Sequence, residues 1–297
     1  MTTLSQEELD GIYAFAVDLG KKAGQMLIDA AQIRIDGGNA NAEQKEHVQK
    51  ENAVDLVTQT DEDIRIMTNL EKGTVNYIHL FPMFCVSIGF IHNNKPLIGV
   101  INAPFLKQFF SSCAGRGAFM NESQRLPLVR NPIPPMPEKA PSGCIFSCEW
   151  GKDRRDVPDG NMHRKIESFV NMAAELGGRH GRGGMVHGVR SLGSATLDLA
   201  YVAMGSFDIW WEGGCWEWDV AAGIAILHEA GGLITTANPP EDYAGAPIEE
   251  VRLGSRLYLA IRPAGPSASE TGRQSQERTV REVWRRVRNL DYSRPGA

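Results

Sequence analysis

The chain has 297 residues, about two ordinary domains' worth at ~150 residues each. Its 42% hydrophobic and 23% charged residues are typical of a globular protein, and they exclude a disordered tail, a collagen-like fibre and a coiled coil. The net charge of -5 excludes a general basic surface for nucleic acid or for an anionic membrane. A phosphate ligand would therefore have to be held locally.

The sequence also predicts where the protein resides. Its longest apolar stretch, residues 77–91, is interrupted by polar residues and a proline, and it is shorter than the ~20 apolar residues of a membrane helix. The N-terminus has no signal-peptide pattern. The five cysteines are scattered and odd in number, which is typical of reduced thiols. We therefore expect a cytoplasmic protein without a membrane segment.

The first elements along the chain are predicted from capping and periodicity. Ser5 and Glu8 form an S-x-x-E capping box ahead of a helical apolar pattern, which predicts a long first helix. Residues 36–52 are typical of a polar loop, and residues 58–70 predict the start of a second helix that ends near Glu71. Apolar runs separated by turns over residues 84–121 predict an antiparallel meander.

A proline-rich stretch divides the chain. Residues 131–143 contain five prolines and predict a linker. We therefore expect an N-terminal α+β part over residues 1–135, a C-terminal α/β part over 136–265 and a final Arg-rich amphipathic helix over 266–297. The seven arginines after residue 270 are interpreted as a solvated helix face.

Common nucleotide-binding and hydrolase motifs do not occur, but four short segments follow one another in a recognisable order. They are KENAVDLVTQTD at 50–61, GTVNY at 73–77, GSA at 193–195 and WDVAAG at 218–223, which continues into EAGG. Together they resemble the inositol monophosphatase family of Mg²⁺-dependent, Li⁺-sensitive phosphomonoesterases. Within that family the sequence is most similar to the member encoded in quinate-utilisation clusters of filamentous fungi.

The resemblance implies a fold and an activity. The fold is an α+β and α/β layered sandwich, and the activity is hydrolysis of a small phosphate monoester, such as inositol monophosphate or a similar polyol phosphate, by metal-activated water. It also implies a homodimer. The site residues carried over are Thr74 as the catalytic residue that orients water, Gly73 and Thr74 at the phosphate, Asp219 at Mg²⁺ and substrate, and Gly193, Ser194, Ala195 and Glu212 at the polyol hydroxyls.

These residue types suit that chemistry, although each has a simpler structural interpretation. Mg²⁺ prefers oxygen ligands, and helix N-termini bind anions. However, Asp219 and Ser194 are also good N-caps, and Gly73 and Thr74 could form an ordinary turn. Glu212 would have no role if it were an exposed surface residue.

The departure from the family pattern affects the metal site most. In the family, D-x-V-T-x-x-D is followed by a strand with G-E-E and by a second strand ending in D-P-[IL]-D-G-T. Here Gly73 follows Asp61 after eleven residues, and Lys72 stands where the family has Asp. Three of the four carboxylates that hold the cations are therefore absent, and internal excision is the simplest account. We expect an incomplete first sheet with an irregular connection over residues 62–74.

The function expected from these observations is a Mg²⁺-dependent phosphatase whose catalysis is impaired in this chain. Two alternatives remain open. The first is a non-catalytic sugar-phosphate-binding or regulatory family member, and the second is a mis-spliced, non-functional product. For the phosphatase and for the binding protein, the partner is a small phosphate monoester. Neither nucleic acid nor membrane is expected as a partner.

Overall fold

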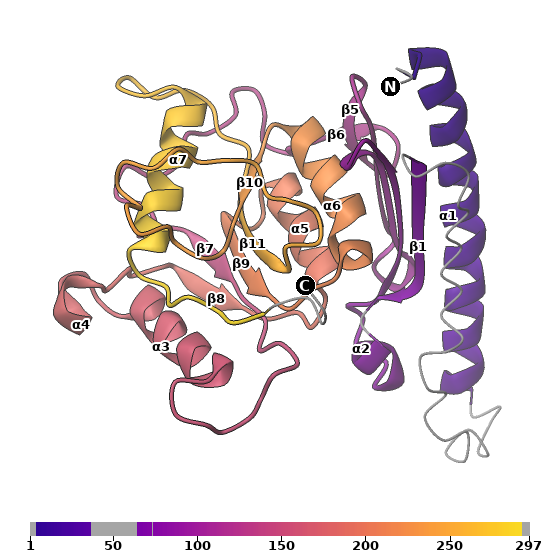
Figure 1. The fold of residues 1–297 in the computed structure, drawn as a ribbon. Coiled ribbons are helices and arrows are strands. Elements are labelled where there is room, and N and C mark those ends of the chain that lie inside the picture. The colour runs from indigo at the N-terminus through magenta and orange to yellow at the C-terminus, as the bar shows by residue number, and fades with distance from the viewer. Residues whose placement is uncertain (1–3, 37–63, 73, 293–297) are drawn as a thin grey trace.

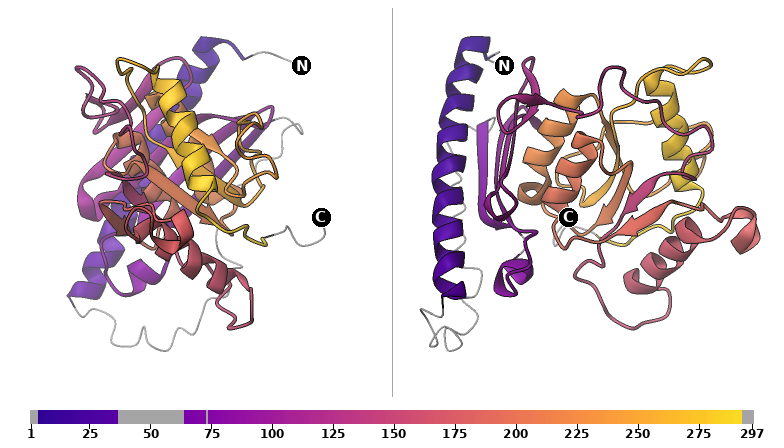
Figure 2. Two further views of the ribbon diagram at one scale, coloured as in Figure 1. Left: turned by 90° about the vertical axis from the view of Figure 1, so that its left-hand side faces the viewer. Right: turned by 180° about the vertical axis from the view of Figure 1, so that it is seen from behind.

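The computed structural model describes residues 4–36, 64–72 and 74–292, and it arranges them in alternating layers of helix and sheet (Figure 1). Helix α1 covers the outer face of a first sheet. Helices α5 and α6 lie between this sheet and a second sheet, whose outer face carries α3 and α7. The views in Figure 2 show the same order of layers. The layered α+β sandwich expected from the sequence is confirmed.

The first sheet is an antiparallel meander, as predicted. In the described part of the chain its strands follow the order β1-β2-β3-β4-β5-β6. Helix α2 (Thr74–Ile78) precedes β2, and a 3-10 turn (Pro104–Leu106) precedes β4. The strands are β1 (Ile64–Lys72), β2 (Cys85–His92), β3 (Lys95–Ala103), β4 (Gln108–Cys113), β5 (Gly117–Met120) and β6 (Gln124–Arg125).

Strand β1 corrects two expectations. Residues 64–72 form neither the end of a second helix nor an irregular connection, because they pair antiparallel with β2, with Met67 opposite Gly89 and Lys72 opposite Cys85. The described sheet is continuous from β1 to β6, with β1 as an edge strand. Pairing with β2 outweighs the local preference of these residues for helix.

Helix α1 (Gln6–Ile35) starts at the predicted capping box. The backbone N–H of Ser5 donates to Glu8 Oε2 at 2.8 Å, and the N–H of Glu8 donates to Ser5 Oγ at 3.3 Å. The helix lies close to the sheet because Gly20 faces β3, where an added Cβ would come within 2.7 Å of Val100. Its buried apolar side chains are those of Leu9, Ala16, Ala23, Leu27 and Ala31.

The second sheet has the strand order β10-β11-β9-β7-β8 among the described residues. Strands β8, β7 and β9 are parallel, whereas β9, β11 and β10 are antiparallel. The strands of this half alternate with helices, as expected for an α/β part. The strands are β7 (Ile145–Ser147), β8 (Gly188–Arg190), β9 (Ile209–Gly213), β10 (Leu233–Thr235) and β11 (Leu257–Ile261).

Helices α5 (Ala195–Met204) and α6 (Glu217–Ala230) form the buried central layer. They pack directly against each other, since a Cβ on Gly223 would lie 2.6 Å from the Cβ of Leu199. Both helices end at a glycine in the left-handed conformation, at Gly205 with φ +88° and at Gly231 with φ +92°. These glycines set the C-terminal ends of the two helices.

The outer layer of the second sheet contains α3 (Asn161–Ala173), the short α4 (Gly178–Gly181) and α7 (Gly272–Trp284). The solvated-face interpretation of the C-terminal arginines is wrong for several of them. Arg281 donates to the carbonyl oxygens of Tyr243 (2.7 Å) and Ala246 (2.9 Å), and Arg278 donates to both carboxylate oxygens of Glu270. Arginine can bind several loop carbonyl groups at once because its guanidinium group carries five N–H donors.

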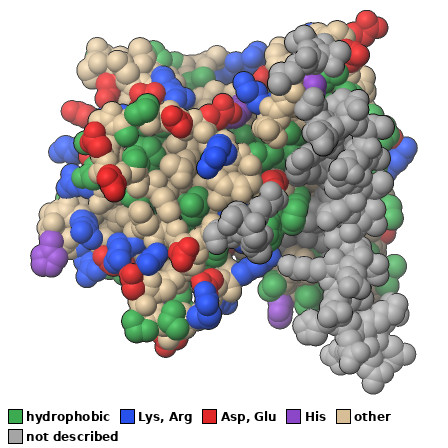
Figure 3. All heavy atoms as spheres, in the orientation of Figure 1, with side chains coloured by type: hydrophobic (Ala, Val, Ile, Leu, Met, Phe, Trp, Pro, Cys, Tyr) green, Lys and Arg blue, Asp and Glu red, His purple; other side chains and the backbone are tan. Residues whose placement is uncertain are grey.

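The surface shown in Figure 3 carries Lys, Arg, Asp and Glu side chains interspersed over the coloured part of that face. None of the helices in the described ranges combines the length and apolar character required to cross a bilayer. The five cysteines are free, and four of them are buried.

Candidate substrate site around the N-termini of α5 and α6

Three segments that carry predicted site residues are joined by hydrogen bonds. Asn76 on α2 donates through Nδ2 to the carbonyl oxygens of Met83 at 2.7 Å and Leu192 at 2.8 Å. The hydroxyl of Thr196 on α5 donates to the carbonyl oxygen of Asp219 on α6 at 2.7 Å. The fold therefore brings together the segment that starts at Thr74, the residues before α5 and the start of α6.

The start of α5 has the predicted geometry. Ser194 is the N-cap, and its Oγ accepts from the N–H of Leu197 at 3.5 Å, while Ala195 is the first helical residue. Gly193 has φ +72°, and an added Cβ would lie 3.0 Å from the side-chain amide of Asn76. Glycine is therefore required here both by the backbone conformation and by the close approach of α2.

Asp219 lies in the first turn of α6 and caps its N-terminus with a side-chain hydrogen bond. The expectation that it is the N-cap is wrong, because α6 begins at Glu217 with Trp216 as its cap residue. Asp219 is the third helical residue, and its Oδ2 accepts from the N–H of Trp216 at 2.8 Å. A carboxylate in the first turn of a helix is stabilised by the helix dipole.

The described residues do not fit a magnesium cage. Asp55, Thr58, Asp61 and Gly73 lie outside the ranges that the structure describes. Within those ranges no group of three or more His, Cys, Asp or Glu side chains is placed to hold a metal ion. Mg²⁺ requires near-octahedral oxygen coordination, and Asp219 alone does not supply it.

Glu212 is a buried residue, so its interpretation as an exposed surface glutamate is wrong. It lies in β9 with 1% of its surface exposed. Oε1 accepts from Lys165 Nζ at 2.5 Å and from the N–H of Gly213 at 2.9 Å, and Oε2 accepts from the N–H of Glu149 at 2.8 Å. Burial opposes the charge of Lys165, but the adjacent Glu212 carboxylate outweighs it and raises the pKa of Lys165.

Glu149 is a site residue that the sequence analysis missed. Its Oε1 accepts from the backbone N–H groups of Leu192 at 2.6 Å and Gly193 at 2.8 Å, and its Oε2 accepts from the hydroxyl of Ser191 at 2.8 Å. The signal that could have found it is its place just after β7, because polar residues at the carboxyl ends of parallel strands frequently face a ligand site.

Asp198 is a second acidic residue that the sequence analysis missed. Its side chain has no exposed surface, and Oδ1 accepts from Ser147 Oγ at 2.6 Å. Burial, and then the nearby charge of Glu149, raise the pKa of Asp198 well above its ordinary value. The carboxyl is therefore protonated over a wider pH range than an exposed aspartate.

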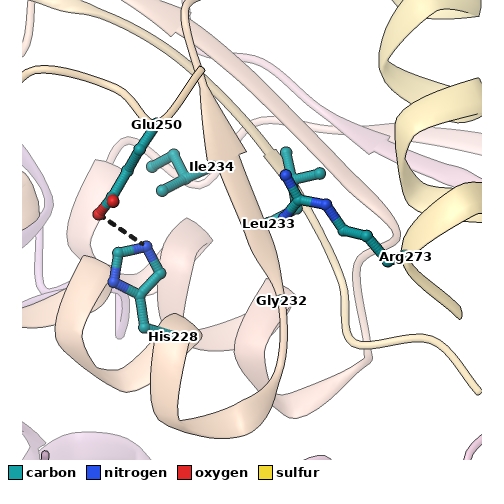
Figure 4. Close-up of a pocket in the computed structure, with 6 residues that line it drawn as sticks. All are labelled: His228, Gly232, Leu233, Ile234, Glu250 and Arg273. Carbon is teal, nitrogen blue, oxygen red and sulfur yellow. Dashed lines mark ion pairs between the residues drawn. The ribbon is translucent and has the colours of Figure 1, made fainter. Parts of the chain in front are cut away.

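A separate hollow of about 280 Å³ lies near the C-terminal end of α6 (Figure 4). His228 Nε2 and Glu250 Oε1 form an ion pair at 3.6 Å on one side of β10, and Arg273 lies on the other side of that strand. Its position at the end of α6 opposite Asp219 separates it from the predicted site residues. The lining residues are His228, Gly232, Leu233, Ile234, Glu250 and Arg273.

The layered fold is that of known phosphomonoesterases. It is similar to the solved inositol monophosphatase from Anabaena (Nostoc) sp., with a TM-score of 0.64 and 28% identity over 95% of this chain and 98% of that one. The chain belongs to the inositol monophosphatase family, whose model matches residues 73–288.

Two fungal relatives match nearly the whole chain. One is the "Quinic acid degradation cluster protein x" of Neurospora crassa, at 60% identity over 99% of both chains. The other is "Protein qutG" of Emericella nidulans, at 64% identity over 98% of both chains. The expected similarity to a quinate-cluster member of the family is therefore confirmed.

The fungal alignments also show a difference in length. The alignment with the Neurospora protein runs over 339 positions, whereas this chain has 297 residues, so at least 42 aligned positions have no residue here. The family model begins to match only at residue 73.

Proposed function

We propose that the chain is an inositol-phosphate-type family member that retains the substrate side of a phosphate monoester site but is a poor magnesium-dependent phosphatase. The observation that carries the proposal is the contrast between the substrate side and the metal side of the site. The start of α5, the start of α6 and α2 are joined by Thr196 and Asn76, yet the described residues provide no acidic cluster for a metal.

The proposed substrate is inositol monophosphate or a similar polyol phosphate. Family membership supports this class, and the start of α5 offers a polar helix N-terminus at Ser194 and Ala195. Gly193 and Glu212 belong to this polyol side in the proposal, Glu212 indirectly through its hydrogen bonds with Lys165 and Glu149, because only 1% of its surface is exposed. Thr74 would orient water, Gly73 and Thr74 would bind the phosphate, and Asp219 would contribute to both substrate and Mg²⁺ binding.

We infer that the residues absent relative to the fungal proteins fall between Asp61 and Gly73. Support comes from the family match, which starts at residue 73, and from Lys72 in the place of an acidic residue. A bound metal that polarises the phosphoryl group lowers the activation free energy of phosphate ester hydrolysis by several kcal/mol. Loss of the metal-binding carboxylates should therefore lower the rate on the order of 10³-fold or more.

The test compares the present chain with a repaired chain that carries a family-type segment, with its G-E-E and D-P-x-D, between Asp61 and Gly73. We expect the repaired chain to hydrolyse inositol 1-phosphate with dependence on Mg²⁺ and inhibition by Li⁺. Lys72→Asp alone should not restore turnover, because further carboxylates are still missing. Equal rates for the unmodified and repaired chains would show that the metal ligands are misplaced in the proposal.

A non-catalytic binding protein is the second candidate function, favoured by the intact hydrogen bonding around Gly193 and Ser194. Isothermal titration of the unmodified chain with inositol 1-phosphate, with and without Mg²⁺, distinguishes the candidates. Binding without turnover supports the binding protein. Sequencing the transcript across codons 61–74 tests the mis-spliced product.

Organisation, assembly and location complete the proposal. We retain the division into residues 1–135, 136–265 and 266–297, since the two sheets end and begin on either side of the proline-rich stretch. A homodimer follows from the family resemblance and is tested by light scattering of the purified chain. The free cysteines support a cytoplasmic location.

A further inference from the structure

A buried ion pair holds the backbone of Glu149 from both sides. Lys165 on α3 has 1% of its surface exposed, and its Nζ donates to Glu212 Oε1 at 2.5 Å and to the carbonyl oxygen of Glu149 at 2.7 Å. The N–H of Glu149 donates in turn to Glu212 Oε2 at 2.8 Å. Both the N–H and the carbonyl of residue 149 are thus fixed by one Lys–Glu pair.

The fixed backbone directs the Glu149 side chain toward the residues before α5. Its carboxylate accepts from Ser191 Oγ and from the N–H groups of Leu192 and Gly193, the three residues that we call the 191–193 loop. Hydrogen bonds to a charged acceptor are roughly twice as strong as neutral ones. The loop continues directly into Ser194 and is held on its other side by Asn76.

We propose that Lys165 is a positioning residue for the substrate side of the site. With Glu212 it fixes Glu149, and Glu149 fixes the 191–193 loop that presents the start of α5. The inference rests on the proposed function, because it assigns the polyol hydroxyls to the start of α5. Lys165 itself does not contact the ligand.

The structural test is hydrogen exchange of the full chain. Lys165→Met removes both donated hydrogen bonds but keeps an unbranched apolar stem, and Glu149→Gln alters only the carboxylate that faces the loop. We expect amides of residues 191–195 to exchange about tenfold faster in both variants, with strands β2 and β3 unchanged. Lys22→Met is the matched control, because Lys22 forms an exposed ion pair with Asp18 on α1.

Lys165→Met leaves the buried Glu212 carboxylate without its ion-pair partner, and this single variant could fail to fold for that reason alone. The double variant Lys165→Met/Glu212→Gln removes that charge and keeps the test decisive. Faster exchange confined to residues 191–195 supports the proposal. Wild-type exchange there, or a uniform increase over the whole chain in the double variant, overturns it, as does a rigid loop in Glu149→Gln.

The ligand test uses inositol 1-phosphate and inorganic phosphate as separate probes. We expect Glu149→Gln to bind inositol 1-phosphate about tenfold more weakly than the unmodified chain and to bind inorganic phosphate equally well. An equal loss for both probes, or no loss for either, overturns the positioning role. If the unmodified chain binds no inositol 1-phosphate, the proposed function fails, while hydrogen exchange still decides the role of Lys165.

Discussion

The backbone of Gly99 in β3 lies directly against the carbonyl oxygen of Ala222 in α6, and an added Cβ would be 2.2 Å from that oxygen. The atom in conflict is backbone, so it cannot move aside as a flexible side chain would. The first sheet and the central layer therefore approach each other at the distance that glycine permits.

Gly99→Ala should destabilise the fold by about 3 kcal/mol, because overpacking forces α6 away from the sheet. Urea denaturation measures the loss. Gly11→Ala is the control, since nothing lies within 4 Å of a Cβ at this position on α1. There alanine should stabilise the helix by about 0.5–1 kcal/mol. A neutral effect at Gly99 would mean that the layers can separate freely.

Thr196→Val should loosen the junction between α5 and α6. Thr196 has no exposed surface, and valine keeps its shape but leaves the carbonyl oxygen of Asp219 without this donor. We expect a loss of about 1–2 kcal/mol in the free energy of unfolding. Thr279→Val is the comparison, because the buried hydroxyl of Thr279 donates to Ser275 within its own helix. Equal losses for both variants would argue against a special role for the junction.

Asp198→Asn should change how stability depends on pH. Because the pKa of Asp198 is raised in the folded chain, the native state binds more protons than the unfolded state above about pH 3.8. Wild-type stability should therefore fall as pH rises toward the folded pKa, by up to about 1.4 kcal/mol per pH unit from this group. Asparagine removes that slope and can still accept from Ser147.

Denaturation of Asp198→Asn at several pH values between 4 and 8 checks the sign. The variant should gain stability relative to wild type as pH rises. Asp18→Asn, which alters an exposed carboxylate on α1, controls for the loss of one negative charge. A parallel pH dependence for wild type and Asp198→Asn would show that the buried carboxyl is not protonated in the folded chain.

Arg281→Met should destabilise the protein by about 2 kcal/mol, since two loop carbonyls lose a charged donor. Arg273→Met on the same helix should cost less than about 0.5 kcal/mol, because Arg273 forms an exposed pair with Glu277. Thermal unfolding of the two variants compares them directly. Similar melting temperatures would restore the interpretation of a solvated arginine face.

Most of the fold could be predicted because its signals are local. The capping box at Ser5, the glycine stops at 205 and 231 and the apolar runs and turns of β2 to β5 each depend on a few neighbouring residues. Strand β1 could not be predicted in this way. Residues 64–72 become a strand only because β2 offers a partner, and that partner follows a dozen or more residues later in the chain.

The residues of the candidate site also fall into two groups, those indicated by a local motif and those brought together only by long-range packing. Ser194 and Asp219 could be found because each belongs to a motif with a recognisable pattern. The contacts of Glu149 with the 191–193 loop, and of Lys165 with Glu212, join residues that are more than forty positions apart. Only the packing of α3 and β7 against β9 brings them together, so no spacing rule could indicate them.

The position of β1 at the edge of the described sheet bears on the segment that we propose to be absent. An edge strand has one neighbour, so shortening the chain beside it disturbs a single ladder and leaves β2 to β5 paired. Three of the family's four metal-binding carboxylates are expected in that same peripheral stretch, whereas Ser194 and Asp219 lie at the starts of the central helices α5 and α6. The layered fold described here thus does not depend on the stretch beside β1, and a chain that lacks the metal ligands proposed to be absent can still adopt it.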